Sequence, residues 1–333
     1  MPPSVLIHGT GAIGTIYTHL LLQAGCAVTA VCRSNYTTVS TQGFTLNSLK
    51  YGQNIPIRPT NVVRTPSEAQ SQGPFDYILI TTKALPNAHP STPNLLSPAV
   101  TPGKTTLVLI QNGLGIEDEY ATFFPSNPLL SCVVYLPTTQ TSPGTVEMGS
   151  VEKLEIGTFP ASSPDSPAYR AAQRFLSTLQ AGGSNASLHE DIQAQRWSKL
   201  LINASWNPIC ALTWSRDVAF LSSSDAAEKL VLDVMDEVVA IAAAKGYGGS
   251  VNGEVAREQL GRALERKREG NGRGIEPSML VDVVRGKRVE VEVILGKPIE
   301  VARGLGVAVP RLETLYALLK GLDESIAARG EGA

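Results

Sequence analysis

Three polar residues, Lys199, Asn203 and Asn207, recur at every fourth position of a stretch that is otherwise rich in Leu, Ile, Ala and Trp. Residues four apart lie nearly above one another on a helix, so one ammonium and two carboxamides would form a polar line. A buried polar line costs free energy unless its hydrogen bonds are satisfied. The spacing therefore predicts a packed protein partner or a bound polar molecule.

The surroundings of this line bear on its chemistry. Burial would lower the pKa of Lys199 toward the working range of an acid catalyst. The structural alternatives are a lysine that snorkels to the surface and asparagines that bond within the core. Three polar residues in register on an apolar helix favour the ligand interpretation. Because Pro208 cannot donate to the carbonyl of Ala204, the helix is predicted to kink or end near Asn207.

The N-terminus carries a glycine motif in the order strand, turn, helix. A short apolar strand, residues 4–8, precedes the motif, and an apolar helix, residues 16–24, follows it. The motif itself consists of Gly9, Thr10, Gly11, Ala12, Ile13 and Gly14. In this context Gly9 permits a tight turn, Gly11 lets the backbone approach a pyrophosphate, and Gly14 allows close helix–strand packing. The helix N-terminus would then face phosphate, which predicts a dinucleotide site.

The end of the second predicted strand, residues 27–32, indicates which dinucleotide binds. Sites for NAD usually place Asp or Glu there, to bond the ribose 2′-hydroxyl. This chain has Arg33, followed by Ser34 and Asn35. A guanidinium with neighbouring hydroxyl and amide donors suits a 2′-phosphate, so the sequence favours NADP(H) over NAD(H). The alternative is a solvated surface arginine.

Further predicted strands, residues 76–81, 105–110 and 130–136, end in polar residues, as expected where parallel strands deliver their carboxyl ends to a ligand. Lys83 follows the first of them and Asn112 follows the second, so both are predicted to contact a ligand. Residues 143–149 and 153–157 are predicted to form a hairpin that extends the sheet, and residues 169–179 a helix. From residue 191 the pattern becomes helical.

The chain is therefore predicted to consist of a Rossmann-type α/β domain, residues 1–190, followed by an all-α domain, residues 191–333. Within the second, residues 226–245 carry apolar side chains at helical spacing, including Leu230, Val231 and Val234. Residues 278–284, 290–304 and 311–326 predict further helices. Residues 254–268 are charged and are expected to be mobile.

Composition limits the partners. The 333 residues are 43% hydrophobic and 17% charged, as is ordinary for a soluble globular protein. Lys and Arg number 28 against 30 Asp and Glu, so no global field attracts nucleic acid or an anionic membrane, and a small molecule is the expected partner. No apolar run is long enough to span a bilayer. The sequence leaves open whether the chain forms a homodimer.

The cysteines and the N-terminus bear on location. Cys26, Cys32, Cys132 and Cys210 are far apart in apolar runs, without the spacing of metal ligands. They are expected to be buried thiols in a reducing compartment, and no metal site is predicted. The first strand is reached by Val5, which leaves no room for a signal or transit peptide, so the cytoplasm is the expected location.

Taken in order, these residues resemble the ketopantoate reductase (2-dehydropantoate 2-reductase) family over nearly the whole chain. The resemblance rests on the Gly9–Gly14 motif, Lys83, Gln111-Asn112-Gly113, Arg196-Trp197-Ser198-Lys199-Leu200 with Asn203 and Asn207-Pro208, Ser278-Met279-Leu280-Val281-Asp282 with Glu290, and Gly304-Leu305-Gly306-Val307-Ala308-Val309-Pro310. It implies a Rossmann domain and a helical domain with the active site in the cleft between them.

The resemblance also implies roles. Lys199 would donate a proton to the ketone oxygen during hydride transfer from NADPH, which is sensible because an ammonium stabilises the negative charge developing there. Asn203, Asn207 and Ser278 would hold the hydroxyl and carboxylate of the substrate. Further contacts are implied for Asn112, with cofactor and substrate, and for Lys83 and Glu290, with the cofactor.

One position departs from the family pattern. Where the family often has an asparagine that supports the substrate, ten residues beyond Asn207, this chain has Asp217. A carboxylate there would repel a carboxylate substrate unless Arg216 or another cation compensates it. The predicted activity is reduction of 2-dehydropantoate to (R)-pantoate. The alternatives are a reductase of another branched 2-keto acid and a non-catalytic protein that senses NADP(H).

Overall fold

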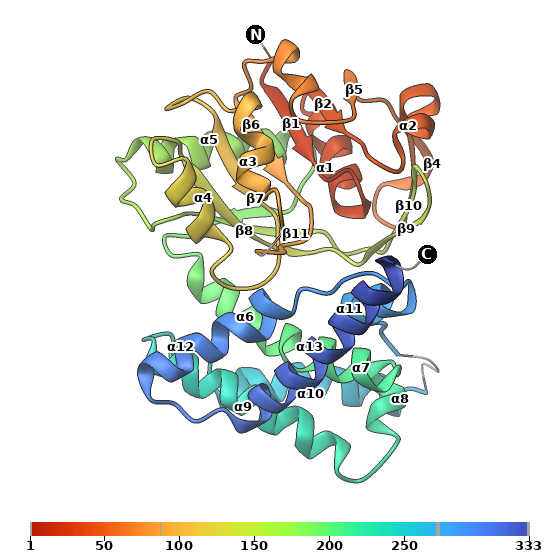
Figure 1. Ribbon diagram of the computed structural model, residues 1–333, viewed down its shortest axis with the longest axis vertical. Helices are drawn as coiled ribbons and strands as arrows, with labels where there is room; N and C mark the ends of the chain where they lie inside the picture. The colour runs from red at the N-terminus through yellow and green to blue at the C-terminus, as the bar shows by residue number, and fades with distance from the viewer. Residues whose placement is uncertain (1, 87, 271–273, 332–333) are drawn as a thin grey trace. The chain divides into compact units, whose positions relative to one another are not determined.

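The computed structural model describes residues 2–86, 88–270 and 274–331 of the chain. Within it the chain divides into two compact units (Figure 1). Unit 1 comprises Met1–Asn112 and Ile116–Ile192, and unit 2 comprises Gly113–Gly115 and Gln193–Ala333. Unit 1 holds the sheets, and unit 2 is helical. The predicted fold class, a Rossmann-type α/β region followed by a helical region, is confirmed.

An eight-stranded sheet forms the centre of unit 1. In spatial order its strands are β12 (Ala186–Leu188), β11 (Lys153–Thr158), β8 (Leu129–Tyr135), β7 (Thr106–Leu109), β6 (Tyr77–Ile80), β1 (Ser4–His8), β2 (Ala27–Val31) and β5 (Asn61–Val63). The six strands from β8 to β5 are parallel, while β11 runs antiparallel to β8. Their order is that of a dinucleotide-binding sheet.

The register aligns the carboxyl ends of the central strands. His8, the last residue of β1, pairs with Val31 of β2 on one side and with Ile80 of β6 on the other. Ile80 in turn pairs with Leu109 of β7. The chain leaves β1 toward β2 and later returns to β6, so the strand order reverses beside β1. Ligands of open α/β sheets bind at such a reversal, next to the carboxyl ends of the strands.

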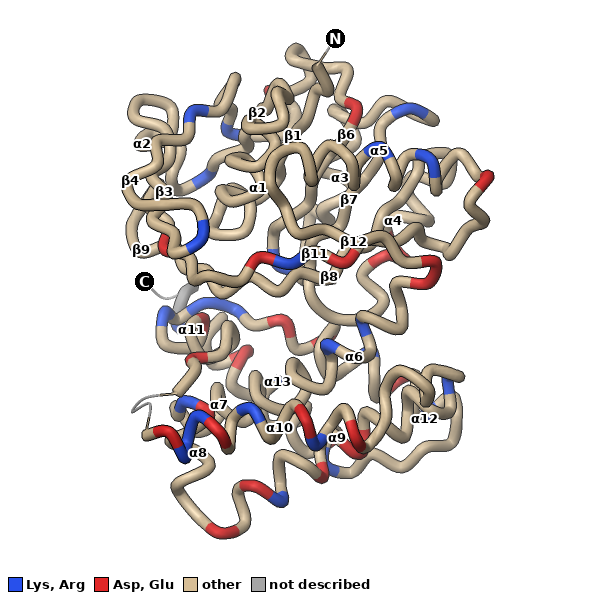
Figure 2. The backbone as a smooth tube through the Cα atoms, turned by 180° about the vertical axis from the view of Figure 1, so that it is seen from behind, with Lys and Arg blue, Asp and Glu red and all other residues tan. Residues whose placement is uncertain are grey.

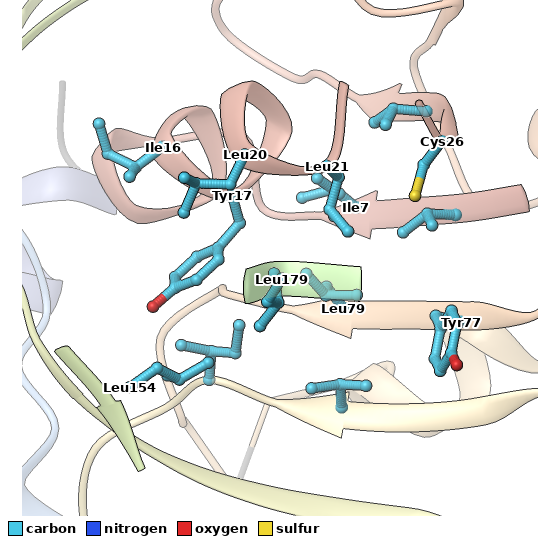
Figure 3. Close-up of a cluster of buried hydrophobic side chains, with 14 of the residues drawn as sticks. Ile7, Ile16, Tyr17, Leu20, Leu21, Cys26, Tyr77, Leu79, Leu154 and Leu179 are labelled. Carbon is cyan, nitrogen blue, oxygen red and sulfur yellow. The ribbon is translucent and has the colours of Figure 1, made fainter. Parts of the chain in front are cut away.

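Helix α1 (Ala12–Gln23) packs its apolar side chains against one face of this sheet (Figure 3). Its Ile16, Tyr17 and Leu20 are fully buried against a core that includes Ile7 of β1. Leu179 of α5 (Pro167–Ala181) joins the same cluster. Each such side chain stabilises the fold by about 1.5–3 kcal/mol relative to an exposed position. The glycine turn that precedes α1 therefore rests on a rigid base.

The shorter helices of unit 1 lie in the connections between strands. They are α2 (Tyr36–Gln42), η1 (Glu68–Gln72), α3 (Thr92–Leu96), η2 (Ser97–Ala99) and α4 (Glu117–Phe123). Two of them begin after a strand end that matters for a ligand, α2 after β2 and α4 after β7.

A second, four-stranded sheet shows that the predicted hairpin of residues 143–157 is wrong. Its order is β4 (Gly52–Ile57), β3 (Phe44–Ser48), β10 (Thr145–Met148) and β9 (Thr138–Ser142). Strand β10 pairs with β9 and, in parallel, with β3 about 100 residues earlier, whereas β11 pairs with β8 and β12 of the main sheet. The turn at Gly144 therefore joins β9 to β10.

The described residues of unit 2 are largely helical. The helices are α6 (Gln193–Asn203), α7 (Trp206–Thr213), α8 (Asp217–Leu221), α9 (Ala227–Ala244), α10 (Gly253–Arg268), α11 (Ser278–Val284), the π-helix η3 (Glu292–Gly296), α12 (Lys297–Leu305) and α13 (Pro310–Glu331). Helix α7 packs against α11 and α13, and α6 packs against α9. Acidic and basic positions are interspersed along these helices (Figure 2).

One helix of unit 2 differs from its prediction, and a second confirms it. Residues 254–268, expected to be mobile, form the regular helix α10, whose first turn is capped by the Asn252 side chain and whose Leu260 is buried. The predicted helix of residues 226–245 is α9, in which Val231 and Val234 are buried and Leu230 is 38% exposed. Helix α10 was not predicted because its buried apolar face is narrow and most of its other residues carry long charged side chains.

The break in the helix that carries the polar line lies before Asn207. Helix α6 ends at Asn203, Ala204 and Ser205 form a turn, and α7 begins at Trp206. Pro208 thus lies in the first turn of α7, where its missing N–H costs little. The Ser205 hydroxyl donates to the carbonyl of Leu201 at 2.5 Å, which stabilises the turn. The prediction of a kink was correct in kind and displaced by about one turn.

Three expectations from the sequence concern the cysteines, metal sites and membrane-spanning helices. All four cysteines are buried as thiols, and burial raises the pKa of Cys26 to about 11 and that of Cys210 to about 12. In the described part of the chain, no cluster of His, Cys, Asp and Glu has the arrangement of a metal site. Over the same residues, no helix combines the length and apolar character needed to cross a membrane.

Candidate active site

The glycine turn of unit 1 is shaped for a close ligand. Gly9 has φ +106°, and a Cβ there would lie 2.6 Å from the Thr82 backbone nitrogen. A Cβ at Gly14 would lie 2.4 Å from the Gly9 carbonyl oxygen, so both positions require glycine. At Gly11 the nearest atom to a Cβ would be 3.9 Å away, which leaves space over the backbone. No side chain caps the first turn of α1, so its N–H groups suit a phosphate, and the turn fits a dinucleotide.

Hydrogen bonds join this turn to the end of β2. The Thr10 hydroxyl donates to the Val31 carbonyl at 2.9 Å and lies 3.0 Å from the Cys32 sulfur. The Asn35 amide donates to the Thr10 carbonyl at 2.8 Å. These bonds fix the loop that carries Arg33, whose side chain is exposed. Arg33 and the glycine turn therefore keep a fixed relation within unit 1.

The charge of Arg33 acts on the strand ends. Burial and, secondarily, the Arg33 guanidinium lower the pKa of His8 from 6.5 to about 4, so this imidazole is neutral at physiological pH. His8 is 7% exposed, and its Nδ1 atom has no hydrogen-bond partner. Arg33 therefore lies close enough to the end of β1 to lower the pKa of His8.

The ends of β6 and β7 are joined in the same way. The Thr81 hydroxyl donates to the Gly9 carbonyl at 2.5 Å, and the Gln111 side chain donates to the Thr82 carbonyl at 2.8 Å. Lys83 and Asn112 follow these residues directly, and both side chains are half-buried. The two predicted contacts thus lie on loops that are tied to the glycine turn.

In unit 2, Lys199 has the electrostatics of an acid catalyst. Burial and, secondarily, the nearby cation Arg196 lower the pKa of Lys199 from 10.5 to about 7, while Glu290 opposes the change. Lys199 is half-buried as a residue, and burial is the main cause of its lowered pKa. A group with a pKa near 7 exists in both protonation states at neutral pH, as proton transfer requires.

The structure brings Asn203, Asn207 and Ser278 together. The Asn207 amide donates to Asn203 Oδ1 at 3.3 Å. Asn207 Oδ1 in turn accepts from the backbone N–H of Met279 at 3.3 Å and from the Ser278 hydroxyl at 3.5 Å. Both amide oxygens are thus used within the protein, and the two amides have further N–H donors. This arrangement suits a ligand that accepts hydrogen bonds, such as a hydroxyl or a carboxylate.

The Asp217 carboxylate is buried and hydrogen-bonded within unit 2. Its Oδ1 accepts from the backbone N–H groups of Val218 and Ile275, both at 2.7 Å, and its Oδ2 accepts from Arg266 at 2.5 Å. Arg216, which the sequence suggested as the compensating cation, pairs instead with Glu276. The carboxylate is 2% exposed and its charge is balanced by Arg266. A sequence cannot show this pairing, because Arg266 lies 49 residues away.

Two further residues were not among the predicted contacts. Arg196 is 3% exposed and donates to the Gly113 carbonyl at 2.8 Å, one turn before Lys199 on α6. Arg64 follows β5, the strand beside β2, and its guanidinium lies 3.9 Å from the centre of the Tyr36 ring. The i, i+3 spacing of Arg196 and Lys199 was visible in the sequence, but the Gly113 acceptor was not.

Comparison with known families identifies the architecture. The model of the family described as "Ketopantoate reductase PanE/ApbA" matches residues 5–161, and that of its C-terminal domain matches residues 191–323. The two matches together span most of the chain. The chain belongs to the ketopantoate reductase family. The resemblance predicted from the sequence is therefore confirmed.

Individual relatives agree with this assignment. The crystal structure of 2-dehydropantoate 2-reductase from Methylococcus capsulatus is 32% identical, with 97% of each chain covered and a TM-score of 0.82. An uncharacterised protein of Saccharomyces cerevisiae is 31% identical over 95% of this chain and 92% of its own length. D-mandelate dehydrogenase, in a ternary structure with NADH and anilino(oxo)acetate, is 21% identical with 97% and 99% covered and a TM-score of 0.81, and shares the fold. This ketopantoate reductase family member is thus similar to a 2-dehydropantoate 2-reductase and shares its fold with D-mandelate dehydrogenase.

Proposed function

We propose that the protein is an NADPH-dependent reductase that converts 2-dehydropantoate to (R)-pantoate, a step toward pantothenate and coenzyme A. The observation that carries the proposal is Lys199, whose pKa is lowered to about 7 on the same helix as the Asn203 amide. Membership of the ketopantoate reductase family supports the reaction class. On this proposal unit 1 binds the dinucleotide and unit 2 binds the substrate.

The residues of unit 1 fit NADPH in chemical type. The glycine turn from Gly9 to Gly14 and the first turn of α1 would receive the pyrophosphate. Arg33, beside Ser34, would bind the 2′-phosphate, which favours NADPH over NADH. Lys83 and Asn112, together with Glu290 of unit 2, would make further contacts with the cofactor. When bound, NADPH supplies the hydride for the reaction.

The residues of unit 2 would provide the acid and the orientation. Lys199 would hold a proton beside the ketone oxygen, stabilise the negative charge that develops there and then protonate it. The N–H groups of Asn203 and Asn207 would donate to the hydroxyl or carboxylate of the substrate, while Ser278 would contribute its hydroxyl and Asn112 an amide. Arg266 neutralises Asp217, which removes the repulsion expected for a carboxylate substrate.

The experiment is a comparison of NADPH oxidation by the purified protein with ketopantoate and with other 2-oxo acids, branched and aromatic. Ketopantoate is expected to give the highest kcat/KM, and Lys199→Ala to lower kcat by roughly 10²–10⁴-fold, the usual worth of a general acid. Turnover that is insensitive to Lys199→Ala would contradict the assignment of the acid. A clear preference for another 2-oxo acid would indicate a related reductase, and turnover of none would contradict the enzyme proposal, leaving an NADP(H)-sensing protein.

A further inference from the structure

Residues 113–115 are the feature from which a further role can be argued. They lie between β7 and α4 in the sequence, yet they pack as part of the helical unit 2. Gly113 and Leu114 are buried there, and Leu114 is 4% exposed. Asn112, the proposed contact of cofactor and substrate, precedes them directly, so its Cα atom lies about 3.8 Å from that of Gly113.

The π-helix η3 provides one anchor for this segment. The backbone N–H of Leu114 donates to the Val293 carbonyl at 2.9 Å. That carbonyl is available because the N–H of Lys297 bonds Glu292 instead, and Pro298 has no N–H to offer. The proline in the first turn of α12 thus explains both the wide helical turn and the open acceptor. π-helical turns are frequent at functional sites.

The shape of Gly113 adds to this anchor. Gly113 has φ +94°, and a Cβ there would lie 2.5 Å from Val293 Cβ and 2.7 Å from the Val293 carbonyl oxygen. Any other residue would therefore strain the backbone and push the segment away from η3. The close approach is specific to glycine at this position.

Arg196 provides the second anchor. Its guanidinium, on a side chain 3% exposed, donates to the Gly113 carbonyl at 2.8 Å. Arg196 and Lys199 are three residues apart on α6 and so share a face of the helix. A hydrogen bond from a charged donor is stronger than one between neutral groups, so this buried contact restrains the Gly113 carbonyl.

We propose that Arg196 is a positioning residue, which fixes the segment Asn112–Leu114 to the helix that carries Lys199. The proposal rests on the proposed function, because positioning matters only if Asn112 and Lys199 serve one reaction. On this view Arg196 and Val293 determine where residues 113–115 lie within unit 2. A misplacement of about 1 Å in such a group can cost about 10²-fold in rate.

The test uses Arg196→Met and Arg196→Lys in the full-length protein, with Arg262→Met as a matched control, since Arg262 is an exposed arginine paired only along α10 with Glu258. Both Arg196 variants are expected to lose roughly 10–100-fold in kcat while NADPH affinity, measured by fluorescence titration, changes less than about twofold. Hydrogen exchange of the peptide that contains Leu114 should become at least about tenfold faster.

The two Arg196 variants separate position from charge. Arg196 and Glu290 are the charged groups that act on the Lys199 ammonium, with opposite effects on its pKa. Arg196→Met should therefore move the basic limb of the pH profile to higher pH, whereas Arg196→Lys should leave it in place and still be slow. Recovery of wild-type turnover in Arg196→Lys would show that only the charge matters and would overturn the proposal.

Gly113→Ala is the second variant, in case Arg196→Met unfolds. It leaves Arg196 and Lys199 intact but displaces the segment, so it should reproduce the loss of kcat, and the two substitutions should be non-additive. Unchanged exchange at Leu114 in the Arg196 variants would overturn the anchoring. If the wild-type protein reduces no 2-oxo acid, the proposed function fails, and exchange at Leu114 still decides whether Arg196 anchors the segment.

Discussion

Replacing Lys199 by methionine is expected to make the protein more stable while removing its activity. Methionine keeps the unbranched apolar stem and removes the ammonium, whose pKa in the folded protein is lowered from 10.5 to about 7. A lowered lysine pKa means that the unfolded chain binds this proton more tightly than the folded protein does. The charged form therefore destabilises the fold.

The size of the effect follows from the two pKa values. Their difference of about 3.5 corresponds to about 4.8 kcal/mol at about 1.36 kcal/mol per pH unit. Because Lys199 is only half-buried as a residue, we take about half of this, or about 2.4 kcal/mol, for the measured change. The destabilisation is complete below pH 7, declines as the pH rises from about 7 to 10.5, and is nearly absent above it.

The assay is urea unfolding of the wild-type protein and Lys199→Met at pH 6, 8 and 10. Lys199→Met should be more stable by about 2 kcal/mol at pH 6, with a difference that shrinks steadily toward pH 10. Lys229→Met serves as the control, because Lys229 is 74% exposed and pairs with Asp233 on the surface, where such pairs contribute less than about 1 kcal/mol. A Lys199→Met protein that is equally or less stable at pH 6 would refute the reasoning about desolvation.

Three other substitutions test the remaining assignments. Arg33→Gln should weaken NADPH binding by about 10–100-fold and NADH binding by less than about twofold, and equal losses in titrations with both cofactors would exclude a contact with the 2′-phosphate. Asp217→Asn should cost about 1–3 kcal/mol in urea unfolding, because Arg266 loses its partner, with an unchanged KM for the 2-oxo acid; a large rise in KM would place Asp217 at the substrate instead. Gly9→Ala should abolish detectable NADPH binding in the same titration, since the added Cβ meets the Thr82 backbone at 2.6 Å.

The central strands of the main sheet, β1, β2, β6, β7 and β8, could be predicted because they are short, largely apolar and almost fully buried. Strand β1, for example, begins and ends as its apolar run does, and the glycine motif follows it directly. The second sheet could not, because β4 and β9 are largely exposed and polar and give no alternating pattern. The pairing of β10 with β3 joins residues about 100 positions apart, a relation that local periodicity does not contain.

The residues of the candidate site show the same division. The polar line of Lys199, Asn203 and Asn207 could be predicted because its spacing matches a helix, although the helix breaks between the two asparagines. The residues that contact the site residues could not be predicted. Arg266 neutralises Asp217 and Arg196 binds the Gly113 carbonyl through contacts that only tertiary packing creates. Reactive residues are therefore easier to identify from a sequence than the residues that position them.

Three chain crossings connect the two units, at 112/113, 115/116 and 192/193, and this limits how modular they are. A cut at 192/193 would separate the helices from residues 113–115, so the Val293 carbonyl would lose its donor, the Leu114 N–H, and the buried Arg196 guanidinium would lose the Gly113 carbonyl as an acceptor. Exchanging one half for that of a relative would create the same mismatch, even though the sequence divides cleanly there. In such a chimera the three residues Gly113–Gly115 would have to come from the parent that supplies the helices.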